Sequence, residues 1–242
     1  MTTIKRFLFI AFFLFFLVGS AGATVATFQQ GTASYTGAKN IWLSVSSPNQ
    51  SKNDSSGYLV LKTGDDNPFD LFYFDISSIP TTATVNSATL TVYVADQACV
   101  AETLQVQAIE NPDNSGAFAM QAAAGDVSNQ YADYLYKDDT TNIDWSSAES
   151  NNFTDVDDAA PESNVAVAAC AAYAAKSMSV TTMVTGWVAN PNSNGGMALS
   201  CTNACSLKIK SLFYATTGER PLLTVDYTEA AGSASREIVI DE

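Results

Sequence analysis

The segment from Phe69 to Val94 limits the possible folds of this chain more than any other part of its sequence. In its second half an apolar residue stands at every other position, which is the period of a strand with one face in a core. These apolar positions are Ala88, Leu90, Val92 and Val94. The first half, 69–76, is apolar on both faces and is typical of a central strand. Because Pro80 cannot donate to a strand ladder, we expect a turn between the two strands.

Short apolar runs separated by Gly, Asn, Asp and Pro continue along most of the chain after residue 23. Many short strands without long amphipathic helices between them indicate a sandwich or jelly roll. The expected strands are 24–28, 41–46, 58–63, 69–76, 88–94, 104–109, 165–169, 177–180, 197–200, 207–214 and 222–227. The expected fold class is therefore all-β, a β-sandwich of jelly-roll type with one long irregular insertion and a short helix.

The short helix is predicted at 181–189, over one end of the sandwich. Met183, Val184 and Trp187 are spaced there as on one face of a helix. We assign Trp42 and Trp187 to the core, because single large apolar residues in patterned elements are usually buried.

Residues 1–23 have the parts of a signal peptide. Lys5 and Arg6 precede an apolar run at 7–18, and small residues follow up to Ala23. A membrane anchor is the alternative, but the run has about twelve residues and a spanning helix needs about twenty. We therefore expect cleavage after Ala23, a secreted or cell-surface protein, and no membrane insertion after cleavage.

The chain is strongly acidic, with a formal net charge of −14 that falls to −16 when Lys5 and Arg6 are removed. The remaining basic residues are few and dispersed along the sequence. Binding to nucleic acid or anionic lipid by counterion release is therefore not expected. Acidity of this kind keeps an exported protein soluble.

The four cysteines are an even number, and two disulfides are the default in an exported protein. The close spacing of Cys201 and Cys205 favours a small local loop, which leaves Cys99 to pair with Cys170. A zinc site is the alternative, but it would need all four sulfur atoms to converge without any histidine.

A long segment, 110–163, interrupts the strand pattern and is rich in Asp, Asn, Ser and Ala. Long connections inside compact domains are usually functional or flexible. Its aromatic residues lie beside acids, a mixture that suits sugars, because an aromatic face stacks on a sugar ring while carboxylates accept hydrogen bonds from hydroxyls. The carbohydrate-binding candidates are Tyr131, Tyr134, Tyr136, Trp145, Asp133 and Asp144. The alternative is that these aromatics only anchor the insertion to the sandwich.

A second group in the insertion carries oxygen ligands suited to a structural calcium ion, the one cofactor expected. Its members are Asn152, Asp155, Asp157 and Asp158. Their spacing matches no EF-hand pattern, so a solvated acidic loop is the alternative.

The chain divides into a signal peptide at 1–23, a sandwich domain at 24–228 and a tail at 229–242. The tail begins with a small-residue linker and then contains Ile238, Val239 and Ile240, enough for one more strand. A strand on a tether can pair with an edge of its own sheet or of a neighbour's sheet. Self-docking or plain disorder is the alternative to assembly.

Three pairs of segments together resemble the DNRLRE domain, a secreted module also classed as family 96 of carbohydrate-binding modules. They are 74–80 (FDISSIP) with 83–90 (ATVNSATL), 180–187 (VTTMVTGW) with 194–196 (NGG), and 213–215 (FYA) with 220–225 (RPLLTV). The resemblance implies a non-catalytic jelly-roll sandwich that in some members binds acidic polysaccharide such as alginate. Family members usually carry a basic residue in the strand before FDLSSIP, and this chain has none at 69–73.

The chain has no histidine, which removes the Ser-His-Asp and Cys-His mechanisms and the usual zinc ligand sets. No glycine-rich phosphate loop joins a strand to a helix, so we do not expect an enzyme. The first expectation is a secreted, non-catalytic module that binds extracellular polysaccharide. The alternative is a structural subunit of a cell-surface or matrix filament, built by association with copies of itself.

Overall fold

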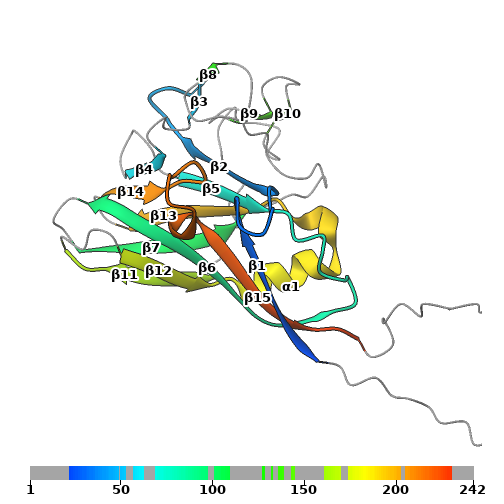
Figure 1. Cartoon of the computed structure of the whole chain (residues 1–242). Coiled ribbons are helices and arrows are strands. Elements are labelled where there is room, and N and C mark those ends of the chain that lie inside the picture. The colour runs from blue at the N-terminus through cyan, green and yellow to red at the C-terminus, as the bar shows by residue number, and fades with distance from the viewer. Residues whose placement is uncertain are drawn as a thin grey trace, which may run out of the picture.

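The fold is an all-β sandwich of two antiparallel sheets with one α-helix across one end (Figure 1). The computed structural model describes residues 22–48, 50–52, 57–62, 69–97, 101–109, 127–128, 132, 136–138, 143–144, 161–169, 174–202 and 205–230. Among these residues no helix is long and apolar enough to cross a membrane.

Each sheet is built from strands that are distant in sequence. The first sheet holds β1 (Ala23–Gln29), β15 (Leu222–Thr228), β6 (Thr84–Gln97), β14 (Ser206–Lys210), β4 (Tyr58–Lys62) and β12 (Ala174–Ser179). The second runs in the order β11 (Ser163–Val167), β7 (Glu102–Ala108), β13 (Met197–Thr202), β5 (Phe69–Phe74), β2 (Ala38–Leu43). The chain changes sheet at most of its connections, which is the topology of a jelly roll.

The remaining elements are short. Two small ribbons pair β3 (Gln50–Ser51) with β8 (Val127–Ser128) and β9 (Tyr136–Asp138) with β10 (Ile143–Asp144). The helical elements are α1 (Thr181–Ala189), η1 (Pro191–Ser193) and η2 (Thr217–Glu219).

Strand β6 organises the first sheet because it pairs with three other strands. β12 lies along one side of it, while β15 and then β14 follow one another along the other side. The alternating residues that the sequence indicated, Ala88, Leu90, Val92 and Val94, are all buried in the core. The opposite sheet contributes Phe72 and Phe74 of β5 to the same core.

The outer face of the second sheet carries a smaller apolar cluster. It consists of Ile41, Leu43, Leu71, Ile109, Ala132 and Ala198. Ala132 belongs to the 110–163 insertion, so part of the insertion packs on this face. This contact explains why β5 is apolar on both faces, as expected from its sequence.

The expected strands are all present, and the helix at 181–189 is confirmed. Trp187 is buried, and Trp42 is half-buried against the core. The main boundary error is the strand expected at 207–214, which ends at Lys210. The amide of Ser211 still donates to the Gly57 carbonyl (2.9 Å), and the chain then turns, with the amide of Tyr214 donating to the Ser211 carbonyl (3.2 Å).

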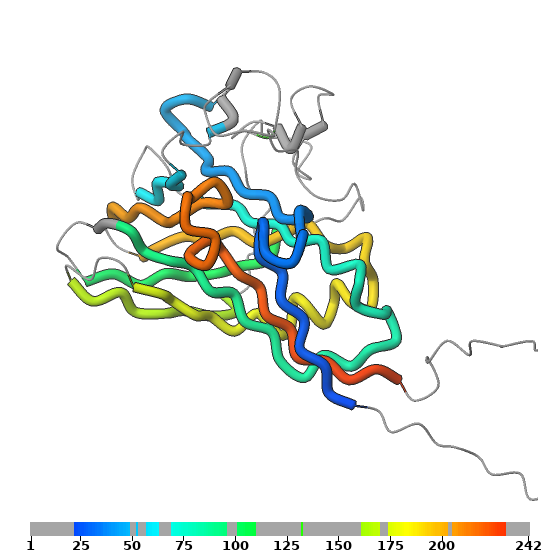
Figure 2. The backbone as a smooth tube through the Cα atoms, in the orientation of Figure 1, coloured from blue at the N-terminus to red at the C-terminus, as the bar shows by residue number. Residues whose placement is uncertain are grey.

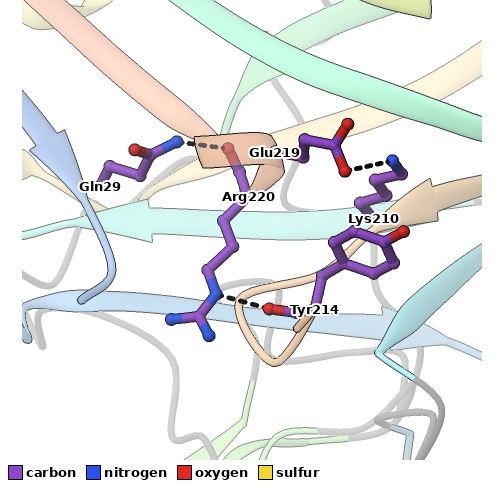
Figure 3. Close-up of polar contacts among 5 residues, drawn as sticks. All are labelled: Gln29, Lys210, Tyr214, Glu219 and Arg220. Carbon is purple, nitrogen blue, oxygen red and sulfur yellow. Dashed lines mark hydrogen bonds and ion pairs between the residues drawn. The ribbon is translucent and has the colours of Figure 1, made fainter. Parts of the chain in front are cut away.

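A polar network fastens the connection between β14 and β15 to strand β1 (Figure 3). The Arg220 Nε donates to the Tyr214 carbonyl (2.8 Å), and its Nη1 donates to the Gln30 carbonyl (3.0 Å). The Gln29 side chain donates in return to the Arg220 carbonyl (2.9 Å). Arg220 thus bridges two turns with charge-assisted hydrogen bonds.

Lys210 is buried in the same network. Its Nζ lies 2.7 Å from a Glu219 carboxylate oxygen and 4.3 Å from the Tyr214 ring centroid. Burial alone would lower the pKa of Lys210, but the contacts with Glu219 and Tyr214 outweigh it and raise the pKa. The contacts with Glu219 and Tyr214 therefore replace the hydration that the ammonium group loses on burial.

Asp70 is a buried acid that the sequence analysis did not single out. It shares the core-facing side of β5 with Phe72 and Phe74 and has no exposed surface, and among the described residues neither of its carboxylate oxygens has a hydrogen-bond partner. Trp42 stands opposite it in the register, and its buried indole N–H also finds no partner in the described part of the chain. Burial raises the pKa of Asp70 well above its ordinary value.

Replacing Asp70 should stabilise the protein at neutral pH. Because the folded-state pKa is raised, the free energy of unfolding should fall as pH rises from about 4 toward that raised pKa. Asp70→Asn should reduce this pH dependence, to which Glu102 contributes in the same direction because burial raises its pKa as well. Asp70→Val should also remove the unpaired polar atoms and add about 1–3 kcal/mol at pH 7. Urea unfolding of the three proteins between pH 4 and pH 8 measures both effects. An unchanged pH dependence in Asp70→Asn would contradict the assignment.

The Cys201–Cys205 disulfide is present, as expected from the sequence. It closes the turn between β13 and β14, and Cys205 is buried next to β4. Cys99 and Cys170 lie outside the described residues, so their pairing stays a prediction.

The registers of the neighbouring strands support a Cys99–Cys170 bond. Val167 lies opposite Glu102, and Ala174 lies opposite Val94. Cys99 lies three residues before Glu102, and Cys170 lies three residues after Val167. Three extended residues span about 11 Å.

Peptide mapping without reduction should recover Cys99 linked to Cys170 and Cys201 linked to Cys205. Free thiols or crossed links would rule out this connectivity.

Candidate functional site

A small pocket lies where the end of β5 meets α1 and η1. Its volume is about 130 Å³. It is lined by Tyr73, Asp75, Ile76, Ser77, Ile79, Thr81, Trp187, Val188, Pro191 and Asn194. These residues come from two parts of the chain that lie more than a hundred residues apart in sequence.

The turn after β5 forms one wall of the pocket. An Asp75 carboxylate oxygen, Oδ1, accepts a hydrogen bond from the Ser77 amide (2.9 Å), which is the Asx geometry that favours a turn. Ile76 and Ile79 are buried and anchor the turn to the core. The polar side chains of Ser77 and Thr81 remain exposed around the opening.

Helix α1 forms the opposite wall and is docked on β6. The Val180 amide donates to the Ala88 carbonyl (2.9 Å), and the Ala88 amide donates to the Thr181 hydroxyl (3.0 Å). Trp187 is only 4% exposed, so it supports the pocket from the core side.

A carboxylate from outside the helix caps the start of α1. Glu162 accepts hydrogen bonds from the amides of Thr182 (2.5 Å) and Met183 (2.9 Å). Val180, at the N-cap position, makes no side-chain cap of its own. Glu162 therefore satisfies two helix amides and places a negative charge at the positive end of the helix dipole.

Asn194 joins the two walls. Its side-chain amide donates to the Phe74 carbonyl (3.0 Å), and its side-chain oxygen accepts from the Gly196 amide (3.2 Å). Asn194 is buried, so these bonds fix η1 relative to the end of β5.

Tyr73 and Asp75 supply the accessible chemistry of the pocket. Burial, followed by the negative charge of Asp75, raises the pKa of Tyr73, so its hydroxyl is a neutral donor. Within the described part of the chain, no residue hydrogen-bonds to this hydroxyl. The Lys39 ammonium lies 5.6 Å from the centroid of the Tyr73 ring, and Asp75 is exposed.

Tyr35 and Gly37 hold the backbone of Asp75 in place. The Tyr35 hydroxyl donates to the Asp75 carbonyl (3.1 Å), and burial followed by the Asp75 charge raises the pKa of Tyr35. The Asp75 amide donates to the Gly37 carbonyl (3.0 Å). A Cβ atom at Gly37 would lie 2.8 Å from the Asp75 Cβ, so this close approach requires glycine.

The carbohydrate site that the sequence predicts in the insertion stays a prediction. Of its six candidates, Tyr136 and Asp144 lie opposite each other in the β9–β10 register. Tyr131, Asp133, Tyr134 and Trp145 lie outside the described residues. The proposed calcium ligands Asn152, Asp155, Asp157 and Asp158 lie outside them as well.

Sequence patterns alone indicate no binding role for the pocket residues. The segments 74–80 and 180–187 carried the family resemblance, and Trp187 was assigned to the core. The signal that could have identified a site was the presence of Asp75 and Trp187 in two segments that resemble one domain, with Tyr73 just before the first of them. Only the packing of α1 against the 75–83 turn brings them together.

Lysines that are far apart in sequence lie on one outer face of the first sheet. Lys62 on β4 and Lys208 on β14 alternate with core residues, and Lys208 stands opposite Val60 in the register. The Lys208 ammonium lies 6.0 Å from the Tyr58 ring centroid, and the Tyr58 and Tyr214 rings are 5.4 Å apart. The two lysines therefore share this outer face with Tyr58, although they lie far apart in the sequence.

No model of a known protein family matches this chain, and no curated protein is similar to it. In the parts of the chain given above, no group of three Asp, Glu, Cys or His side chains converges in a way that could hold a metal ion.

Removing the Glu162 cap should loosen α1 and with it the pocket. Glu162→Ala leaves two helix amides without partners and should lower the free energy of unfolding by about 0.5–2 kcal/mol. Glu162→Gln retains one acceptor oxygen and should lose less. Thermal unfolding measures the cost, and amide exchange at Thr182 and Met183 should accelerate in Glu162→Ala. Unchanged exchange at these amides would show that the cap is not needed.

Proposed function

We propose that this protein is a secreted, non-catalytic β-sandwich module that binds extracellular polysaccharide through the pocket between the 75–83 turn and α1. The observation that carries the proposal is that the partly buried Tyr73 and the exposed Asp75 both line this pocket. The resemblance of 74–80 and 180–187 to the DNRLRE domain supports it, because these two segments form the walls.

The pocket chemistry suits sugar hydroxyls. The exposed part of the Tyr73 side chain can contact a sugar ring, and its hydroxyl can donate a hydrogen bond. Asp75 uses Oδ1 in the turn, which leaves the second carboxylate oxygen to accept from a sugar hydroxyl. Since about 130 Å³ is well below the roughly 300–1,000 Å³ of drug-sized pockets, the pocket fits one unit of a longer chain.

Electrostatics favours a neutral polysaccharide. The full chain has a formal charge of −14, which becomes −16 when the two basic residues of the signal peptide are removed. Asp75 adds an exposed carboxylate at the pocket. A polyanion would be repelled at this site unless calcium bridged the two. Neutral glycans should therefore be retained without calcium.

Binding should depend on Tyr73 and Asp75. Asp75→Asn keeps the Oδ1 acceptor that forms the turn but removes the charge, so it should weaken binding roughly tenfold or more with little effect on stability. Tyr73→Ala should weaken binding similarly. Affinity electrophoresis in gels with neutral or acidic polysaccharide, with and without calcium, measures retention.

The matched control is Tyr93→Ala. Tyr93 lies on β6 between the buried residues Val92 and Val94, so it faces outward from the opposite sheet and should not affect retention. Retention that is unaffected by Asp75→Asn and Tyr73→Ala would place the binding site elsewhere. No retention of any glycan would refute the function itself.

A further inference from the structure

Strand β1 is an open edge of the first sheet. It pairs along its full length with β15, and no other described strand pairs with it. Of its residues only Phe28 and Gln29 are buried, and Val25 is 62% exposed. The rest of β1 is therefore held chiefly by its ladder with β15.

The β1 edge lacks the sequence features that usually prevent another strand from pairing with it. Natural edge strands are often protected by lysine, proline or a bulge. β1 has the sequence ATVATFQ, with no charge and no proline, and its register with β15 is continuous. Its unpaired amides and carbonyls can accept another strand.

The tail leaves the sandwich at the end of this edge. Thr228 lies opposite Ala23, so β15 ends beside the start of β1 (Figure 2). The tail then has the linker at 229–235 and the apolar residues Ile238, Val239 and Ile240. A segment with strand-forming residues is thus tethered next to an open edge.

We propose that the segment 236–240 of one copy adds as a strand to the β1 edge of a second copy, so that the exported protein assembles by strand addition. This inference does not depend on polysaccharide binding. Donor and acceptor are both parts of the same chain, so no other partner is required.

Strand direction favours the second copy over the tail's own sheet. A tail that turned directly back onto its own β1 would lie parallel to it, since β15 and β1 are antiparallel. Parallel pairing is slightly less stable per residue. For antiparallel pairing within one copy, the tail strand would have to start beside Gln29, about 23 Å along β1 from the point where β15 ends. The linker 229–235 covers that distance only when fully extended.

Two variants test the donor strand and the acceptor edge separately. Deletion of Ala230–Glu242 removes the donor strand. The double variant Val25→Glu and Thr27→Glu puts negative charges on the edge, which repel Glu237 and Asp241 of an incoming tail. Val25→Lys with Thr27→Lys is the matched control for the sign of the charge.

Light scattering and negative-stain microscopy of the exported protein test the proposal. The wild type should form dimers or longer assemblies, whereas the deletion and the Glu variant should each be monomeric with melting temperatures near that of the wild type. A mixture of these two variants should form a one-to-one complex, because one keeps the donor and the other keeps the edge. The Lys variant should assemble better than the Glu variant.

Three results would overturn the proposal. They are a wild type that stays monomeric at high concentration, a deletion that leaves the assemblies unchanged, and a mixture of the two variants that stays monomeric. None of them depends on glycan retention, so failure of assembly and failure of polysaccharide binding are measured separately.

Discussion

The structure depends on burial of the inner face of β6 against the second sheet. Leu90, Val92 and Val94 have no exposed surface and face a core to which β5 contributes Phe72 and Phe74. β6 also carries the ladders to β12, β14 and β15 and the docking point of α1. Because burial of apolar surface is the dominant favourable term in folding, the other elements are positioned by their contacts with this strand.

The pocket follows from that arrangement. The start of α1 is fixed at Ala88 of β6 by hydrogen bonds to Val180 and Thr181, and the turn that begins at Asp75 leads from β5 to β6. Glu162 then caps the start of α1, and Asn194 links η1 to the end of β5. The pocket is thus built from packed elements, and its lining residues with exposed or partly exposed polar side chains include Tyr73, Asp75, Ser77 and Thr81.

Two buried ionisable residues of this sandwich, Lys210 and Asp70, differ in whether other groups replace their lost hydration. Lys210 is surrounded by Glu219 and Tyr214, so its lost hydration is replaced by paired contacts. Asp70 has no such replacement, and its carboxyl is driven toward the neutral form. The first arrangement orders the connection between β14 and β15, and the second costs stability at neutral pH.

The sequence by itself determined the strands, the helix and the all-β class, because alternation and helical spacing are local patterns that a core face imposes on neighbouring residues. It also favoured the Cys201–Cys205 bond through close spacing. Tertiary structure alone decided which strands pair, that Asp70 faces the core without a partner, and that Tyr73 and Asp75 meet α1. These outcomes depend on contacts between residues far apart in sequence, and no local period records such contacts.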